Sequence, residues 1–295
     1  MCRLFGQISN IEMDAGDFLV NRCFSLLRQS SWDKKHLQKD GWGIGEWKTE
    51  NREWKIVKSS KPVFKEQDKF KGIAKKGGSK IILAHIRKAS NPKKLQRRRL
   101  VASKNCQPFA YQNLIFAHNG TLNIPDEVAE SLGRYKKNIC GINDSEVLFW
   151  LFVKIWEQVS HSKKSSPLEG EGGGEGALQR NWKCIFQKMR QSIQQVWNRI
   201  PRRERKFSSP WRGLNCIASD GKSLAAHCYY QKREGKSLCG QNRPYFEMCY
   251  NILQGRIVVA SEPMDDGNNW KPIRNKHLVV INSQLRVEHL QLKDS

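Results

Sequence analysis

Apolar runs of strand length occur in two groups, one before residue 120 and the other after Pro210. Residues 80–85 and 113–118 form two such runs, and the chain opens with another at residues 2–8. After Pro210 further runs follow, at 215–218, 224–230, 245–250, 256–261, 278–282 and 285–292. Short apolar runs bounded by turn residues predict strands.

Glycine-containing pairs predict where some of these strands turn. Asp220-Gly221 separates two of the late runs and predicts a hairpin. Asn119-Gly120 directly follows the run at 113–118 and predicts a tight turn. Residues 41–45, with three glycines, predict a glycine-rich strand or loop.

Between the two groups of strands, the apolar positions change to helical spacing. From Asp144 onward they recur every three or four residues, at Val147, Leu148, Leu151, Phe152, Ile155, Trp156 and Val159. The same spacing predicts a second long helix over about 182–200 and a shorter one over 17–27, capped by Asp17. Asn143 and Asp144 are both suitable N-caps for the first long helix, and the sequence leaves that choice open.

A glycine-rich segment separates the two long helices. Residues 169–176 consist only of Glu and Gly, so we predict a flexible, low-complexity insertion at about 160–180. A linker between domains is one interpretation, but we favour a surface loop within a single domain that covers residues 2–295. Strands, then helices, then strands again predict an α+β layered fold rather than a repeating βαβ series.

The composition supports a folded protein and gives no sign of a membrane or metal partner. Hydrophobic residues make up 38% of the chain and ten residues are Trp, enough for a substantial core. No apolar stretch approaches the roughly 18–20 residues of a membrane span, and no signal peptide is apparent, so we expect a cytoplasmic protein. The nine cysteines lack the close spacing of zinc or redox motifs, and no metal or cofactor is expected.

The charge balance suggests a different class of partner. Lys and Arg number 52 against 28 Asp and Glu, which gives a formal net charge of +24. Such an excess favours binding to polyanions such as nucleic acid. The densest basic runs lie at 93–99 and 199–206, yet the sequence has no zinc-finger spacing, RNP aromatics or basic region before a heptad repeat. We therefore interpret the charge as a general surface excess and do not expect a nucleic-acid partner.

Cys2 has a chemistry that no other cysteine of the chain can have. Removal of the initiator Met1, which is usual before a small residue, would leave a thiol and a free α-amine on one residue. An α-amine has a pKa of about 7.7–8.0, well below that of a lysine side chain. It is therefore partly neutral at physiological pH and can accept the thiol proton.

Five segments occur in a characteristic order along the chain. They are Cys2-Arg3-Leu4-Phe5-Gly6, His85-Ile86-Arg87, Asn105-Cys106-Gln107-Pro108-Phe109, Phe116-Ala117-His118-Asn119-Gly120 and Asn143-Asp144-Ser145-Glu146. With Asp40-Gly41-Trp42-Gly43 and Ala260-Ser261-Glu262-Pro263, this series resembles the class II glutamine amidotransferases, in particular their stand-alone branch. The resemblance covers nearly the whole chain apart from the glycine-rich insertion. Gln107 and Asn143 differ from the commoner His and Thr of that branch, and neither belongs to the catalytic set.

The resemblance implies a four-layer αββα sandwich of the N-terminal-nucleophile hydrolase type, in which Cys2 is the nucleophile. The side-chain amide of Asn119 and the backbone N–H of Gly120 would stabilise the oxyanion. Arg87 would bind the α-carboxylate of the substrate and Asp144 its α-ammonium group. The expected substrate is a small molecule, glutamine or another γ-glutamyl amide. It would pass through a γ-glutamyl thioester, which water hydrolyses to glutamate.

Several alternatives remain at this stage. Released ammonia would pass to a separate synthase subunit, or cleavage of the amide is itself the purpose, and the sequence does not choose. A different N-terminal-nucleophile amidohydrolase is a rival, although Arg87 with Asp144 suits an α-amino acid better than another acyl group. A catalytically inactive, basic nucleic-acid-binding relative is a second rival. His85 and His118 are interpreted as structural, because the free amine takes the role of base.

Overall fold

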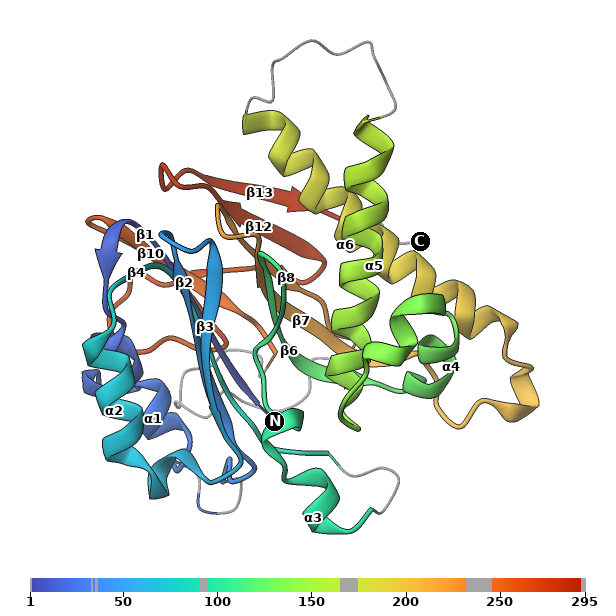
Figure 1. Ribbon diagram of the computed structural model, residues 1–295, viewed down its shortest axis with the longest axis horizontal. Helices are drawn as coiled ribbons and strands as arrows, with labels where there is room; N and C mark the ends of the chain where they lie inside the picture. Colours follow the sequence, from blue (N-terminus) through green and yellow to red (C-terminus); the bar gives the residue numbers. More distant parts are fainter. Residues whose placement is uncertain are drawn as a thin grey trace.

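Two antiparallel sheets form the centre of the molecule, and helices cover the outer face of each (Figure 1). The computed structural model describes residues 2–32, 34, 37–90, 95–164, 175–231 and 246–292. Most of the predicted insertion at 160–180 lies outside the residues whose side chains are described, and so do residues 93–94 of the first basic run. Among the described residues, no helix has both the length and the apolar character to span a membrane.

The first sheet has seven strands in the order β11-β9-β10-β1-β4-β2-β3. Its strands are β1 (Arg3–Met13), β2 (Trp42–Lys48), β3 (Glu53–Ser59), β4 (Ser79–Ile86), β9 (Cys249–Leu253), β10 (Arg256–Ala260) and β11 (Lys271–Pro272). The second sheet has six strands in the order β13-β12-β8-β7-β6-β5. Its strands are β5 (Phe109–Tyr111), β6 (Leu114–Leu122), β7 (Trp211–Ser219), β8 (Leu224–Cys228), β12 (His277–Ile281) and β13 (Val287–Gln291).

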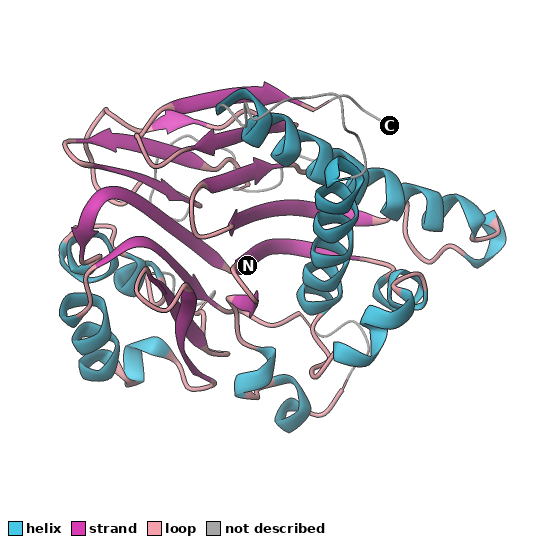
Figure 2. Cartoon of the chain, turned by 45° about the horizontal axis from the view of Figure 1, so that its top comes forward, coloured by secondary structure: helices cyan, strands magenta, loops and turns pink. Residues whose placement is uncertain are grey.

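The helices divide between the two outer faces (Figure 2). The long pair α5 (Asp144–Lys164) and α6 (Glu175–Arg199) packs on the six-stranded sheet, whereas α1 (Leu26–Gln29) and α2 (Gln67–Lys76) pack on the seven-stranded sheet. Two short helices, α3 (Arg97–Leu100) and α4 (Pro125–Glu130), lie near the ends of the strands. Short 3-10 or π-helical segments also occur among the described residues, namely η1 (Asp17–Asn21), η3 (Val63–Lys65), η4 (Ser103–Asn105), η5 (Gly133–Asn138) and η6 (Arg202–Glu204). The predicted αββα arrangement is confirmed.

Burial of both faces of each sheet explains why the strands are apolar runs rather than alternating patterns. In β1, Leu4 and Ile8 point into the core between the sheets, whereas Phe5 points into the core beneath α1 and α2. In β6, Ile115 belongs to the core between the sheets and Phe116 to the core beneath α5 and α6. Successive side chains of a strand face opposite sides, so a strand buried on both sides needs apolar residues at most positions.

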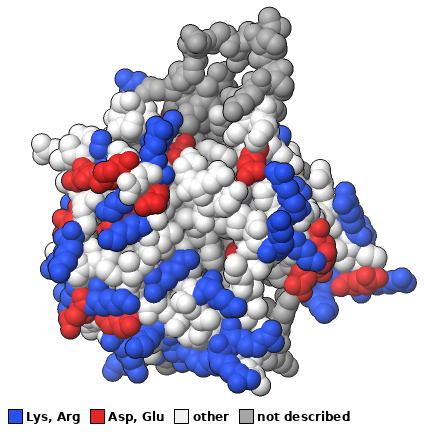
Figure 3. Space-filling view, viewed as in Figure 1, with Lys and Arg blue, Asp and Glu red and all other residues white. Residues whose placement is uncertain are grey.

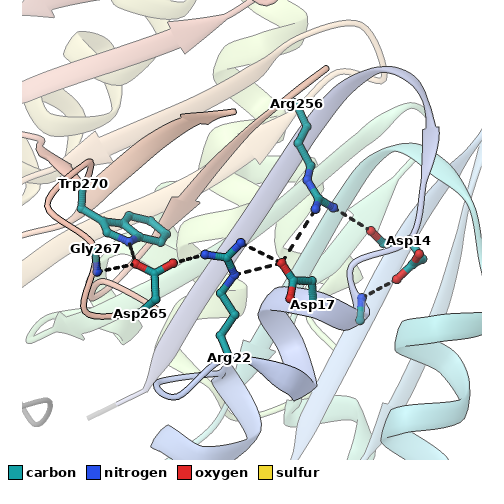
Figure 4. Close-up of polar contacts among 8 residues, drawn as sticks. Asp14, Asp17, Arg22, Arg256, Asp265, Gly267 and Trp270 are labelled. Atoms are coloured by element: carbon teal, nitrogen blue, oxygen red, sulfur yellow. Dashed lines mark hydrogen bonds and ion pairs between the residues drawn. The ribbon is translucent and has the colours of Figure 1, made fainter. Parts of the chain in front are cut away.

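The helix predicted from Asp17 is interrupted. The structure has the single turn η1, ends it before Arg22, and starts α1 at Leu26, where the Ser25 side chain accepts a hydrogen bond from Arg28 N. Asp17 does not cap a helix, because its carboxylate accepts a hydrogen bond from Arg22 Nε at 2.9 Å and also pairs with Arg256. Figure 4 shows this network, in which Arg22 also bonds Asp265. Competing arginine partners therefore override the capping preference.

Two further boundaries differ from the prediction. The pair Asn119-Gly120 does not form a turn: it lies inside β6, where Asn119 opposes Asn215 and Gly120 opposes Leu214 of β7. The two long helices extend further than predicted, because α5 continues to Lys164 and α6 already begins at Glu175. Residues 177–180, Ala-Leu-Gln-Arg, are good helix formers, which explains the earlier start of α6. The prediction of a single domain over residues 2–295 stays a prediction.

Candidate active site

Cys2 lies at the start of β1, between the two sheets (Figures 1 and 2). It is half-buried, and its Sγ receives a hydrogen bond from Lys88 N at 3.4 Å and donates one to Lys88 O at 3.6 Å. Antiparallel pairing of Arg3 with Ile86 brings the end of β4, and with it Arg87 and Lys88, beside the thiol. The first strand and the strand that ends in His85-Ile86-Arg87 are therefore neighbours, although more than eighty residues separate them in sequence.

A buried ion pair anchors the residue that follows the thiol. Arg3 Nη2 lies 2.8 Å from Glu262 Oε1, and the two side chains are 0% and 3% exposed. Arg3 Nη1 donates to the carbonyl of Cys2 at 3.1 Å. Ser261 accepts a hydrogen bond from Leu4 N at its Oγ, and its own N–H donates to Leu4 O. The segment 260–263 thus holds the start of β1 in place, a role that the sequence alone did not reveal.

A cavity of about 660 Å³ opens beside Cys2. Its lining includes four of the five residues that the sequence identified, namely Cys2, Arg87, Gly120 and Asp144. Asn119, the fifth, is 2% exposed and is not part of the lining, and its Oδ1 has no hydrogen-bond partner among the described residues. The structure therefore brings together residues from the starts or ends of β1, β4, β6 and α5.

Arg87 is held by the turn that precedes β2 and by the end of α3. Its Nη1 donates to Leu100 O at 2.8 Å and to Asp40 O at 3.3 Å, and its backbone N–H donates to Gly41 O at 2.8 Å. The Asp40 carboxylate accepts hydrogen bonds from Ala89 N at 2.8 Å and from Arg97 at 2.9 Å. Among the described residues, no hydrogen bond engages Nε or Nη2 of Arg87, so these donors can face a ligand.

Gly41 has to be glycine for this arrangement. Its φ is +118°, and a Cβ there would lie 2.4 Å from Cys106 Sγ and 2.6 Å from Ser59 O. Only glycine reaches that backbone conformation without strain. The Asp40-Gly41 pair is therefore part of the positioning of Arg87.

The start of α5 resolves the choice between two caps. Asn143 Oδ1 accepts a hydrogen bond from Ser145 N at 3.1 Å, so Asn143 is the N-cap. The Asp144 carboxylate accepts one from Leu122 N at 2.8 Å and borders the cavity. Glu146 completes the turn by accepting from the backbone N–H groups of Cys140 and Gly141. In the described part of the chain, the other carboxylate oxygen of Asp144 accepts no hydrogen bond, so it is left for another partner.

His118 is a neutral, fully engaged side chain. Its Nε2 lies 3.1 Å from Gly213 O, and because a carbonyl only accepts, Nε2 carries the proton. Its Nδ1 then accepts from Ser145 Oγ at 3.0 Å. Burial lowers the pKa of His118, although the nearby Asp144 acts in the opposite direction. His118 therefore has no free nitrogen with which to activate a thiol.

His85 is also unsuited to the role of base. Burial holds its pKa well below the usual value, and the positive charge of Arg87 adds to the effect. Neither this imidazole nor that of His118 is among the hydrogen-bond partners of Cys2. Gln107 links the strands around both histidines, since its side chain bonds the backbone N–H and C=O of His118 at 2.6 and 3.1 Å. These contacts agree with the structural role expected for both histidines.

The thiol itself needs an activating group. Burial raises the pKa of Cys2, whereas the hydrogen bond from Lys88 and the charge of Arg87 lower it, and Asp144 raises it. The net effect is a raised pKa, so the thiol is protonated near neutral pH.

Among the described residues, no three His, Cys, Asp or Glu side chains are placed to hold a metal ion.

Basic side chains are unevenly distributed over the surface. Figure 3 shows Lys and Arg gathered at the lower edge of one face, over α3, while acidic and basic side chains are mixed elsewhere on that face. Arg97, Arg98 and Arg99 of α3 are all exposed, and Arg99 lines the cavity. The basic side chains of α3 thus reach the cavity through Arg99.

Comparison with known sequences shows two matches. The model of the family "Glutamine amidotransferases class-II" matches residues 1–172. A curated relative from Saccharomyces cerevisiae, "Probable glutamine amidotransferase DUG3", is 22% identical over 318 residues, which cover 98% of this chain and 84% of the relative.

Solved structures share the fold. The "glutamine aminotransferase class-II domain protein" of Silicibacter pomeroyi superposes with a TM-score of 0.61 at 16% identity, covering 99% of this chain and all of that one. The glutamine phosphoribosylpyrophosphate amidotransferase of B. subtilis superposes with a TM-score of 0.56 at 15% identity. That match covers all of this chain but only half of the B. subtilis chain. At such identities the likeness concerns the fold alone.

Proposed function

The chain belongs to the class II glutamine amidotransferases, and we propose that it hydrolyses the side-chain amide of glutamine or of another γ-glutamyl compound through Cys2. The observation that supports this most directly is the cavity that Cys2, Arg87, Gly120 and Asp144 line together. Those residues come from separate segments, and each has the chemistry that one part of the substrate requires.

The proposed reaction begins after removal of Met1. The neutral α-amine of Cys2 takes the thiol proton, and the thiolate attacks the γ-carbonyl carbon of the substrate. The oxyanion that forms is stabilised by the Asn119 side-chain N–H and the Gly120 backbone N–H. Collapse of this intermediate breaks the C–N bond, and the amine leaves with the proton. Water then cleaves the γ-glutamyl thioester, releasing glutamate and restoring the thiol.

Recognition of the glutamyl end relies on opposite charges. The free donors of the Arg87 guanidinium suit a carboxylate, since its planar fork can form two parallel hydrogen bonds. The second oxygen of Asp144 suits an ammonium group. This pair of charges favours an α-amino acid over the acyl groups of other amidohydrolases. Ammonia released from glutamine would serve a separate synthase, and an amine released from a larger conjugate would be a product in itself.

The experiment that tests the proposal is mass spectrometry of the purified protein with a diazo-ketone analogue of glutamine. We expect the intact mass to lack Met1 and the reagent to form one adduct, which peptide mapping places on Cys2. Excess glutamine should slow the labelling. A protein that keeps Met1, or a processed Cys2 that stays unlabelled at saturating reagent, would contradict the proposal and favour the basic, inactive relative. For that rival, binding to nucleic acid that weakens steeply with salt is the matching result.

Asn119→Ala is expected to lower kcat by about 10²- to 10³-fold, the usual effect of removing one oxyanion donor. KM should change little, because the donor acts on the transition state rather than on the bound amide. Steady-state ammonia release gives both constants. The unfolding free energy serves as the control, since Asn119 is buried within β6. A variant with normal kcat and raised KM would assign Asn119 to substrate binding instead.

A further inference from the structure

The cavity beside Cys2 is larger than a glutamyl group requires. Its volume of about 660 Å³ lies within the range of roughly 300–1,000 Å³ that is typical of sites for drug-sized ligands. The lining continues past Gly120 and Asp144 onto α4, the end of α6 and the segment that follows η6. We call this outer part the distal pocket and define it by Ile124, Trp197, Ile200, Arg205 and Phe207.

Arg205 is the best-organised cation of the distal pocket. Its Cζ lies 4.7 Å from the centre of the Trp197 ring, and its Nε donates to Ile200 O at 3.0 Å. The side chain is half-buried, and among the described residues no hydrogen bond engages its two terminal nitrogens. Stacking and one hydrogen bond therefore hold the guanidinium in place while its outer edge stays available, the geometry that suits a carboxylate.

The surrounding charges favour an anionic ligand. Apart from Arg87 and Asp144, the cavity is lined by five cations, Lys88, Arg99, Arg205, Lys206 and Arg212, against three acids, Asp126, Glu127 and Glu204. Glu204 lies 3.8 Å from Arg203, a residue outside the lining, so part of its charge is already compensated. The balance over the whole lining is therefore positive, and Arg205 places one of these cations in the distal pocket.

The apolar part of the distal pocket favours a ligand that is more than a small ion. Ile124 and Trp197 are nearly buried, at 4% and 6% exposure, whereas Phe207 leaves 43% of its surface in solvent. Ile142, which also lines the cavity, is 39% exposed. Apolar side chains left exposed at the edge of a cavity can be covered by an apolar ligand group at a gain in free energy.

We propose that the distal pocket binds the amine half of the substrate and that Arg205 determines specificity by binding an acidic group on it. The substrate class is then a γ-glutamyl amide whose amine carries an apolar body and an anionic end. The inference rests on the proposed function, because it assumes that the glutamyl half lies beside Cys2. It also gives a role to the basic run at 199–206, which the sequence alone assigned to general surface charge.

The test measures binding to the Cys2→Ala protein, which cannot turn the ligand over. Three probes are titrated by calorimetry: γ-glutamylphenylalanine, γ-glutamylphenethylamine, which lacks only the terminal carboxylate, and glutamine. We expect γ-glutamylphenylalanine to bind about tenfold or more tightly than the phenethylamine conjugate, as a charge-assisted bidentate contact would produce. Arg205→Gln should remove that difference. Arg202→Gln, at an exposed arginine outside the cavity lining, should preserve it.

Turnover by the protein with its native Cys2 separates the two hypotheses. If Arg205→Gln keeps a normal kcat/KM for glutamine but loses the preference for γ-glutamylphenylalanine, the proposed function and the inference about Arg205 both hold. If glutamine is hydrolysed and the two conjugates bind equally, or no better than glutamine, the inference is wrong while the proposed function stands. If no amide is hydrolysed, the proposed function fails, and the binding difference still decides whether Arg205 recognises an anion.

Discussion

Cys2→Ala is expected to lower kcat for amide hydrolysis by about 10⁴-fold or more, because the proposed acyl intermediate forms on the Cys2 thiol. Alanine is as small as cysteine, so removal of Met1 should proceed in the variant as it does in the native protein. Ammonia or amine release under single-turnover conditions gives the measurement. Cys23→Ala is the matched control, since Cys23 is exposed and outside the cavity, and it should leave kcat unchanged.

A second variant tests which group activates the thiol. A protein that carries two extra residues before Cys2 keeps the thiol but converts the α-amine into an amide, which has no basic nitrogen. We expect this protein to be as inactive as Cys2→Ala. The two nearby histidines are poor substitutes for the amine, since both nitrogens of His118 are engaged and, among the described residues, His85 forms no hydrogen bond with the thiol. Substantial activity in the extended protein would show that another group accepts the proton.

Much of the fold could be predicted from the sequence because both faces of each sheet are buried. Apolar runs such as β4 and β10 were identified almost to the residue, and the hairpin between β7 and β8 was confirmed. The strands that were not predicted, β3, β5 and β11, are partly exposed or very short. Their patterns differ little from those of loops, so local sequence could not distinguish them.

The error at Asn119-Gly120 has a specific physical cause. In isolation the pair favours a hairpin turn, but here β6 continues through it and pairs with β7. A Cβ at position 120 would lie 1.9 Å from Gly213 O, so the glycine is needed for close approach of two strands rather than for a turn. A local rule cannot tell these uses apart, because the partner strand lies more than ninety residues away in the chain.

The candidate site, like the fold, could be predicted from the sequence only in part. The residues proposed for direct contact with substrate came from motifs whose roles the resemblance implies, whereas their supports lay in motifs that received no such role from the sequence. Asp40 holds the loop after β4, and Glu262 pairs with Arg3 from the far end of the chain. Arg205 lay within a basic run that looked like surface charge, and only the stacking on Trp197 distinguishes it.

Glu262→Met is expected to lower the free energy of unfolding by about 3–5 kcal/mol, the usual cost of removing one partner from a buried ion pair. The substitution keeps a similar volume but takes away the carboxylate that lies 2.8 Å from Arg3. Urea denaturation followed by tryptophan fluorescence would give the change. Glu130→Met provides the control, because its ion pair with Lys136 is exposed, at 71% and 50%, and should contribute about 1 kcal/mol or less.

A double variant separates the stability of the pair from its position beside the thiol. Adding Arg3→Met to Glu262→Met removes both buried charges, and replacing a whole buried pair with apolar groups is often close to neutral. We therefore expect part of the lost stability to return. Activity should stay low, because the double variant also lacks the hydrogen bond from Arg3 to the Cys2 carbonyl. If the double variant recovers both stability and kcat, Arg3 is a structural residue only and does not position the nucleophile.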